Sequence, residues 1–358
     1  MKVSIVLNRA NRSWIIEKIA TRLAQELAAF DVEATVSESA EKTSDIVHHM
    51  SWAFANTRTS QLSTMFITHL DDSHKIGQVC STLHSQTVNV GICMSSDTRQ
   101  QLLDEGIKSE HLTFISPAHD AVVKPRRIVL GLTTRLYPDG RKREQLLLDV
   151  TSRMNLEEFE FRIFGAGWEK VVPELERAGA IVLYQQETSD YLHDYSSMLA
   201  AIPGFDYYIY LGMDEGSLGT LDALASGVKT IITPQGFHLD LVDGITHPVL
   251  TSDDLEAVLR GILDERQSRI TSVQDLTWKA FAKSHFELWT AMRSHQAIPH
   301  PSHNIANTSA QVISDMKQLR QQGIHHNAMS LRRILSRVSH MRILRPLRHL
   351  IDRLRLKR

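Results

Sequence analysis

Cysteines, long apolar runs and an export signal are scarce or missing in this chain of 358 residues. Only Cys80 and Cys93 are present, each within a segment that we expect in the core, which favours reduced thiols over a disulfide or a metal site. No apolar run approaches the roughly 20 residues of a membrane-spanning helix. The amino terminus lacks the long apolar run and small-residue cleavage site of a signal peptide. We therefore expect a cytoplasmic, globular protein.

Acidic residues are almost missing from the last thirty positions. Residues 329–358 contain ten Lys or Arg and one acid, Asp352, a balance of +9. Subtracting them from the 40 basic and 41 acidic residues of the chain leaves 30 and 40 in 1–328, a balance of −10. Aliphatic residues recur at helical spacing in this tail, with arginines on the other face and an expected kink at Pro346. This pattern predicts a basic amphipathic helix on an anionic membrane surface.

A nucleic acid and another protein are the alternative partners for this basic tail. A nucleic acid is disfavoured, because no aromatic residue is interleaved for base stacking. A docking helix for another protein stays an alternative.

Short apolar runs alternate with helical patterns over most of the chain, which predicts βαβ units and parallel sheets. The first series of predicted strands covers 3–7, 32–36, 46–48, 65–68, 88–94 and 112–115. The second covers 128–132, 159–164, 181–184, 207–211 and 230–233. A proline and several charges at 122–127 separate the two series. After 250 only helical patterns follow, at 253–264 and 274–293.

The predicted organisation has four parts. An N-terminal Rossmann-like domain, 1–122, precedes a C-terminal Rossmann-like domain with closing helices, 123–295. Residues 296–328 form a linker, and 329–358 form the basic amphipathic helix.

The stretch with most chemical information is 211–227, LGMDEGSLGTLDALASG. A strand is expected to end there, and an acidic pair, Asp214 and Glu215, precedes a glycine-containing loop and a helix. Free backbone N–H groups at a helix start attract phosphates. Carboxylates bind hydroxyl groups, such as those of ribose or a hexose. For this loop alone, an ordinary capped helix start is the alternative interpretation.

This stretch resembles the signature of the retaining glycosyltransferases of the GT-B fold, in the large bacterial group 1 (family 4-like) class. That signature has an acid, a glycine-rich loop, a second acid eight residues after the first, and then Ala-Met-Ala-x-Gly. Asp222 and the ALASG that follows match its second half. Glu215 with Gly216 matches the first half, although Glu215 stands seven residues before Asp222. Asp214 stands at the full spacing of eight and is the alternative first acid.

The resemblance also covers the neighbouring strand ends. Residues 130–143 resemble the family's first strand of the C-terminal domain, in which Arg135 and Lys142 match the cations that bind the diphosphate. Arg141 is an alternative to Lys142. Gly165 lies in a turn that resembles the next strand end, and His69 resembles a histidine that the family places opposite the donor. Residues 8–12 depart from the family, whose glycine-rich loop after the first strand is missing.

Roles for the site residues follow from the resemblance. Glu215, Arg135, Lys142 and His69 would be catalytic, and Asp222 would bind the ribose hydroxyls. Donor contacts are implied for Gly165 and for the backbone amides of Gly216, Ser217, Leu218 and Gly219. No metal and no cofactor is implied, because cations would stabilise the leaving nucleotide.

Two facing Rossmann-like domains and a specific reaction are implied as well. A hexosyl or deoxyhexosyl group would pass from a nucleoside-diphosphate sugar to a glycan or lipid-linked acceptor, with retained configuration. The reaction would serve polysaccharide synthesis for the bacterial cell envelope at the inner face of the membrane. A non-catalytic GT-B nucleotide-sugar-binding subunit of a polysaccharide synthase complex stays open as the alternative. An epimerase or a phosphorylase on the same fold is disfavoured, because an epimerase has no use for the basic tail and no pyridoxal phosphate lysine site is recognisable.

Overall fold

The computed structural model describes residues 1–301 and 314–316, which form two compact units. The first unit contains Met1–Asp120 and the described residues from Leu276 onward, and the second contains Ala121–Asp275. The predicted basic helix, 329–358, and most of the predicted linker, 296–328, lie outside the described residues. Within the described part of the chain, no helix combines the length and apolar character that a membrane span needs.

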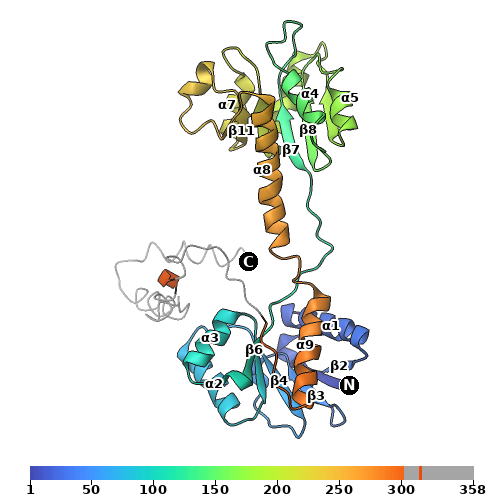
Figure 1. The fold of residues 1–358 in the computed structure, drawn as a ribbon, viewed down its shortest axis with the longest axis vertical. Coiled ribbons are helices and arrows are strands. Elements are labelled where there is room, and N and C mark those ends of the chain that lie inside the picture. Colours follow the sequence, from blue (N-terminus) through green and yellow to red (C-terminus); the bar gives the residue numbers. More distant parts are fainter. Residues whose placement is uncertain (302–313, 317–358) are drawn as a thin grey trace, which may run out of the picture. The chain divides into compact units, whose positions relative to one another are not determined.

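The first unit contains six parallel strands in the order β2-β1-β3-β4-β5-β6 (Figure 1). They are β1 (Lys2–Val6), β2 (Glu33–Ser37), β3 (Ile46–His49), β4 (Leu62–Ile67), β5 (Val90–Cys93) and β6 (Leu112–Phe114). The helices between them are α1 (Ile15–Leu27), α2 (Ser73–His84) and α3 (Ser96–Asp104). Every residue of β3 and β5 is buried, as expected for parallel strands covered on both faces.

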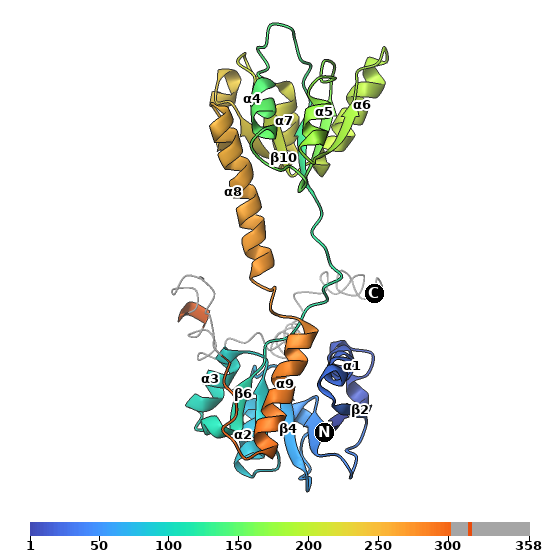
Figure 2. The ribbon, with the colours of Figure 1, turned by 45° about the vertical axis from the view of Figure 1, so that its right-hand side comes forward.

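Helix α9 (Trp278–Arg293) completes the first unit, although it follows the second unit in sequence (Figures 1 and 2). Its Phe281, Leu288 and Trp289 are buried in one core cluster with Ile5 of β1 and Leu23 of α1. This differs from the prediction, which placed all of 123–295 in the C-terminal domain. The apolar face of α9 packs against α1 and the first sheet, in the core of the first unit.

The second unit contains another six parallel strands, in the order β12-β11-β10-β7-β8-β9. They are β7 (Ile128–Leu132), β8 (Phe159–Phe164), β9 (Ile181–Gln185), β10 (Tyr207–Tyr210), β11 (Lys229–Ile232) and β12 (His247–Pro248). The helices are α4 (Gln145–Thr151), α5 (Val172–Arg177), α6 (Tyr191–Ala201), α7 (Leu218–Ala225) and α8 (Ser252–Thr271). The two parallel sheets with their helices confirm the prediction of two Rossmann-like domains. The short β12 was not predicted, and α8, with 20 residues, is eight residues longer than the predicted helix 253–264.

Six short 3-10 helices lie between these elements in the described residues. They are η1 (Arg9–Asn11), η2 (Ala28–Phe30), η3 (Trp52–Phe54), η4 (Ser109–His111), η5 (Ile202–Gly204) and η6 (Gly236–Asp240).

The direction of the winding reverses at β7 in the second sheet. The chain runs from β7 outward through β8 to β9, and β10 then returns to pair with the other side of β7. The loops that follow β7 and β10 therefore leave the carboxyl edge of the sheet in diverging directions. A ligand crevice is commonly found at such a switch point in an open parallel sheet.

Candidate functional site

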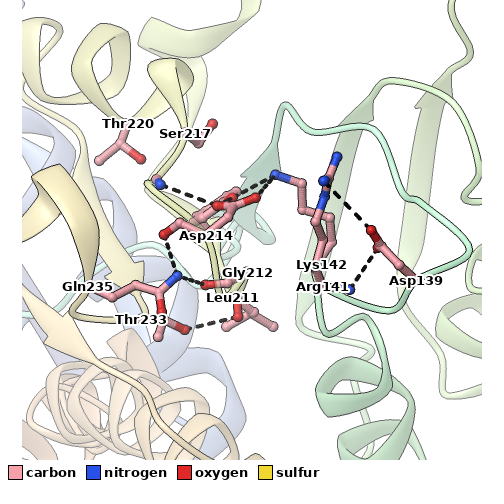
Figure 3. A network of polar contacts seen from close by, with 12 residues as sticks. Asp139, Arg141, Lys142, Leu211, Gly212, Asp214, Ser217, Thr220, Thr233 and Gln235 are labelled. Atoms are coloured by element: carbon pink, nitrogen blue, oxygen red, sulfur yellow. Dashed lines mark hydrogen bonds and ion pairs between the residues drawn. The ribbon is translucent and has the colours of Figure 1, made fainter.

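The loops after β7 and β10 are joined at the switch point. The backbone N–H of Met213, after β10, donates to the carbonyl oxygen of Arg141, after β7, at 2.8 Å. The Lys142 Nζ donates to Asp214 Oδ2 at 2.6 Å, and Figure 3 shows the two side chains reaching toward each other. Lys142 and Asp214 thus bring together two of the segments that the sequence singled out.

Tyr210, the last residue of β10, completes this contact. The Lys142 Nζ also donates to the Tyr210 hydroxyl at 2.7 Å, and that hydroxyl donates in turn to Asp214 Oδ1. The Lys142 side chain is only 11% exposed. Lys142 is therefore a shielded cation held at a fixed place on the sheet edge.

The protonation of this group follows from burial and charge. Burial raises the pKa of Asp214, but the hydrogen bonds from Lys142 and Tyr210 outweigh it and leave the pKa below its usual value. Burial, followed by the bond to Asp214, raises the pKa of Tyr210. At neutral pH, Asp214 is a carboxylate and Tyr210 a neutral phenol. Sequence reasoning did not find Tyr210, because an aromatic residue at the end of a buried strand has the pattern of a core residue.

The backbone of the next residues is constrained by close packing. Gly216 has a φ of +119°, and a Cβ there would lie 2.6 Å from the Phe237 ring and 3.0 Å from His238 Nε2. Its N–H donates to Asp214 Oδ1 at 3.2 Å. Only glycine fits both the left-handed backbone and the space.

The segment after β11 holds this loop from behind. Gln235 Nε2 donates to the carbonyl oxygens of Gly212 at 2.9 Å and Asp214 at 2.5 Å. The N–H of Phe237 donates to the carbonyl oxygen of Glu215 at 3.1 Å. The loop that contains the acidic pair is thereby fixed on both sides, by Lys142 and by 235–238.

His238, which is fully buried, acts at the start of α7. Its Nδ1 lies 3.2 Å from the Thr233 carbonyl oxygen, which can only accept, so Nδ1 carries the proton. Its Nε2 then accepts from the N–H of Ser217 at 3.3 Å and from the Thr220 hydroxyl at 3.0 Å. The imidazole is thus a neutral acceptor that fixes Ser217, the residue before α7, and Thr220 in its first turn. Sequence reasoning missed it, because His238 lies 21 residues after Ser217.

Ser217, the N-cap residue of α7, makes no capping hydrogen bond with its side chain. Its hydroxyl is bonded to the Tyr208 hydroxyl at 2.8 Å, and Tyr208 is bonded to Thr133 at 2.9 Å. A Cβ on Gly219 would lie 2.0 Å from Thr133 Oγ1 and 2.6 Å from the Tyr208 hydroxyl. Gly219 therefore allows the first turn of α7 to approach the end of β7. The first N–H groups of a helix have no intrahelical acceptor and carry partial positive charge.

The two candidate acids, Asp214 and Glu215, have different environments. Asp214 is engaged by Lys142, Tyr210 and the Gly216 N–H. Glu215 is exposed, and among the described residues its carboxylate forms no hydrogen bond or ion pair. Asp222, in α7, is half-buried and likewise has no side-chain partner in the described part of the chain. Glu215 and Asp222 are thus the carboxylates available to a ligand, whereas Asp214 serves the loop itself.

The other predicted cations of this edge have partners. Arg135 forms an ion pair with Glu187, with Nε 3.1 Å from Oε1, and its side chain is 52% exposed. The Arg141 guanidinium lies 4.1 Å from the centroid of the Tyr137 ring. Among the predicted cations, Lys142 is the one held beside the acidic loop.

Gly165, predicted to contact the donor, lies where the loops after β7 and β8 meet. It has a φ of +126°, and a Cβ there would lie 2.7 Å from the Thr134 carbonyl oxygen. This close approach of two backbones by itself explains the glycine. A contact of Gly165 with a donor stays a prediction.

His69 belongs to the first unit, just after β4. Its side chain is exposed, and its Nδ1 lies 3.1 Å from the Thr68 hydroxyl. Its predicted contact with the donor stays a prediction.

Comparison with known proteins gives structural likenesses at low identity. No family model matches the chain, and no curated protein sequence matches it. The chain is similar to the lipopolysaccharide outer core galactosyltransferase WaaB in its apo form, with 15% identity over 82% of this chain and 100% of that chain, and a TM-score of 0.33. It is similar to Anabaena Alr3699/HepE in complex with UDP-glucose, with 12% identity over 82% and 98%, and a TM-score of 0.30.

A third similar structure is S. aureus MnaA with UDP, with 9% identity over 85% of this chain and 100% of that chain, and a TM-score of 0.30. Identities and TM-scores this low do not establish a family.

Proposed function

We propose that this protein is a glycosyltransferase that transfers a sugar from a nucleoside-diphosphate sugar to a glycan or lipid-linked acceptor. The observation that carries the proposal is the contact between the loops after β7 and β10, at the switch point of the second sheet. Lys142 is shielded there beside the loop of Glu215 and the start of α7. The carboxylates of Glu215, in that loop, and Asp222, in α7, have no partner among the described residues. A cation with helix N–H groups suits a diphosphate, and free carboxylates suit sugar hydroxyls.

In this proposal each group of the edge has a separate task. Lys142 and the first N–H groups of α7 bind the diphosphate and stabilise the charge that develops as it leaves. Glu215 orients the transferred sugar, and Asp222 binds the ribose. Arg135 adds a second cation when the diphosphate takes the place of Glu187.

We propose transfer with retained configuration and without a metal ion. The bond between the anomeric carbon and the diphosphate oxygen breaks, and a bond from the acceptor oxygen forms on the same face. The acceptor proton passes to the departing diphosphate, so no protein nucleophile is needed. The protein contributes orientation and a fixed electrostatic environment.

The second candidate is a nucleotide-sugar-binding subunit without catalysis. One observation favours it: the charge of Lys142 is already balanced by Asp214. Such a subunit binds the donor but does not release its nucleotide.

A panel of UDP-, GDP- and dTDP-sugars distinguishes the two functions. Thermal shift and nucleotide release are measured on the full chain with and without EDTA, and on Glu215→Gln and Lys142→Gln. Stabilisation by one nucleotide class, with EDTA-resistant release that Glu215→Gln abolishes, supports the transferase. Binding without release supports the subunit. If no nucleotide raises the melting temperature, the donor site is refuted.

We further propose that the basic segment 329–358 holds the protein on an anionic membrane surface. Each Lys or Arg near such a surface contributes roughly 1 kcal/mol. Sedimentation of the full chain with vesicles containing or lacking phosphatidylglycerol tests this. Changing Arg342, Arg345 and Arg348 to Gln is expected to release the protein at physiological salt. Equal sedimentation with neutral vesicles would contradict the proposal.

A further inference from the structure

A concave site lies within the second unit, at the edge of the sheet opposite the candidate donor site. A cavity of about 530 Å³ is bordered by the first residues of three neighbouring strands: Ile128 of β7, Tyr207 of β10 and Lys229 of β11. Helix α8 closes one side with Ile262 and Arg266. Strands of four or five residues rise roughly 13–17 Å, which separates the two edges. The volume is within the range of about 300–1,000 Å³ typical of small-molecule sites.

The lining of this cavity is strongly basic. Its charged residues are five cations and one acid: Arg126, Arg127, Lys229, Arg266, Arg269 and Asp206. The surroundings make this unusual, because residues 1–328 carry a net charge of −10 and residues 178–228 contain seven acids and no Lys or Arg. A cluster of cations against this background indicates a local anion-binding surface.

Only part of this positive charge is balanced by neighbouring acids. Arg126 pairs with Asp206 at 2.6 Å. Arg127 donates to a backbone carbonyl and forms no ion pair in the described residues. Lys229 also has no ion pair in the described part of the chain; its nearest aromatic contact is the Tyr207 ring, at 5.8 Å.

The two lining arginines of α8 each form an ion pair. Arg269 pairs with Glu265, at 2.6 Å, and Arg266 pairs with Glu158, at 3.0 Å. Arg266 is the most buried of the lining cations, with 14% of its side chain exposed. Its Nη1 is buried without a hydrogen-bond partner among the described residues. A buried charged donor without an acceptor is costly, and an anion in the adjoining cavity would offset that cost.

Capping of α7 does not account for these cations. The end of α7 borders the cavity through Ser226 and Gly227. Three carbonyl oxygens of its last turn accept backbone hydrogen bonds: Asp222 from Ser226, Ala223 from Val228, and Leu224 from Gly227. These three carbonyls do not need the cations as partners.

We propose that this basic cavity, lined by Arg126, Arg127, Lys229, Arg266 and Arg269, binds a phosphate-bearing anion. Guanidinium groups match phosphate oxygens in pairs, and a lysine adds a compact charge. The phosphate group belongs either to a small soluble molecule or to a phospholipid headgroup. The site is independent of the proposed donor site, because the two lie at opposite edges of the sheet.

The test uses the full chain with Lys142→Gln, which removes the cation of the donor site. Inorganic pyrophosphate is titrated by calorimetry, and dihexanoyl phosphatidate below its micelle concentration is titrated in parallel. We expect saturable binding of one equivalent. Adding Arg127→Gln and Lys229→Gln, both exposed positions, is expected to weaken the binding at least tenfold. Arg266→Gln gives a third, more buried variant.

Arg260→Gln is the matched control, because Arg260 also lies on α8 and pairs with Glu256 but does not line the cavity. We expect it to leave the affinity unchanged. Tighter binding of pyrophosphate identifies a soluble ligand, and tighter binding of the phosphatidate identifies a headgroup. Absence of saturable binding, or equal affinity in the Arg127→Gln, Lys229→Gln variant, would overturn the proposal. Nucleotide-sugar turnover tests the donor site separately.

Discussion

Asp214 and Glu215 are adjacent acids with opposite tasks. The Asp214 carboxylate binds Lys142, Tyr210 and the Gly216 N–H, whereas the Glu215 carboxylate has no partner in the part of the chain that the structure describes. Spacing alone left open which of the two acids would contact a donor. Sequence counting places Asp214 at the expected eight residues from Asp222, and the contacts instead favour Glu215 as the acid that meets the donor.

Substitution of the two acids should therefore have different effects. Glu215→Gln is expected to lower turnover about a hundredfold with the melting temperature unchanged, because it removes only a contact with the transferred sugar. Asp214→Asn is expected to lower the free energy of unfolding by about 1–3 kcal/mol, because Lys142 loses the carboxylate with which it forms an ion pair. The same change should raise the donor KM, because the Lys142 side chain is then no longer fixed in place. Initial rates and urea denaturation measure both. The opposite assignment of the two effects would make Asp214 the donor acid.

His238 acts through α7 rather than on a ligand. Replacing it with Leu leaves the Ser217 N–H and the Thr220 hydroxyl without their acceptor, at a cost of about 1–3 kcal/mol. We expect His238→Leu to raise the donor KM about tenfold. His238→Gln, which can supply an acceptor near Nε2, should recover most of the affinity.

His285→Leu is the control for this variant. His285 is equally buried and also bonds a backbone carbonyl through Nδ1, at 2.8 Å from the Phe281 oxygen, but it lies in the first unit. His285→Leu should lower the free energy of unfolding without changing the donor KM. If both variants change the KM alike, His238 has only a general structural role.

Helix α7 depends on glycine at its second position. A methyl group on Gly219 would overlap Thr133 Oγ1 and the Tyr208 hydroxyl, at 2.0 and 2.6 Å, so the helix start would have to move from the end of β7. Gly219→Ala is therefore expected to destabilise the protein by at least about 1–3 kcal/mol and to abolish thermal stabilisation by the donor.

Gly261→Ala in α8 provides the comparison, because no atom lies within 4 Å of the added methyl group. That change should stabilise the protein by about 0.5–1 kcal/mol, as expected for Ala in a helix interior. Thermal unfolding with and without nucleotide sugar measures both. A Gly219→Ala protein that still responds to the donor would show that α7 need not approach β7.

At the scale of the whole molecule, the first unit is discontinuous in sequence, because the second unit is inserted between its β6 and its α9. Helix α9 brings His285 against His48 of β3, with ring centroids 5.3 Å apart. Burial, and then the neighbouring His285 and His49, lower the pKa of His48. Burial lowers the pKa of His285 to about 4, outweighing its bond to the Phe281 carbonyl oxygen. Neither Nε2 atom has a partner in the described residues.

Acid should therefore weaken the first unit in particular. Above the unfolded pKa of about 6.5, the histidine is neutral in both the folded and the unfolded protein. Between pH 6.5 and pH 4 only the unfolded protein takes up a proton there, so the free energy of unfolding decreases as the pH is lowered. For His285 the loss reaches on the order of 3 kcal/mol by pH 4. Hydrogen exchange at pH 7 and pH 5, corrected for intrinsic rates, should show lost protection in β3 and α9.

His285→Leu should reduce that pH dependence of protection. Peptides of β10 and α7, in the second unit, provide the internal reference. Equal loss of protection in both units would contradict the assignment of the effect to the histidine pair.

Local sequence determined the two parallel sheets, because each buried strand has its own short apolar run in the sequence. It also located the loop of Glu215 and the cation Lys142, because strand ends and helix starts have local signals. It could not determine that Lys142 meets Asp214 across 72 residues, or that Trp289 of α9 donates to Thr64 across 225. Those contacts depend on which surfaces bury one another when the chain folds. The same holds for His238 and for the basic cavity, whose residues come from distant elements that only the folded sheet brings together.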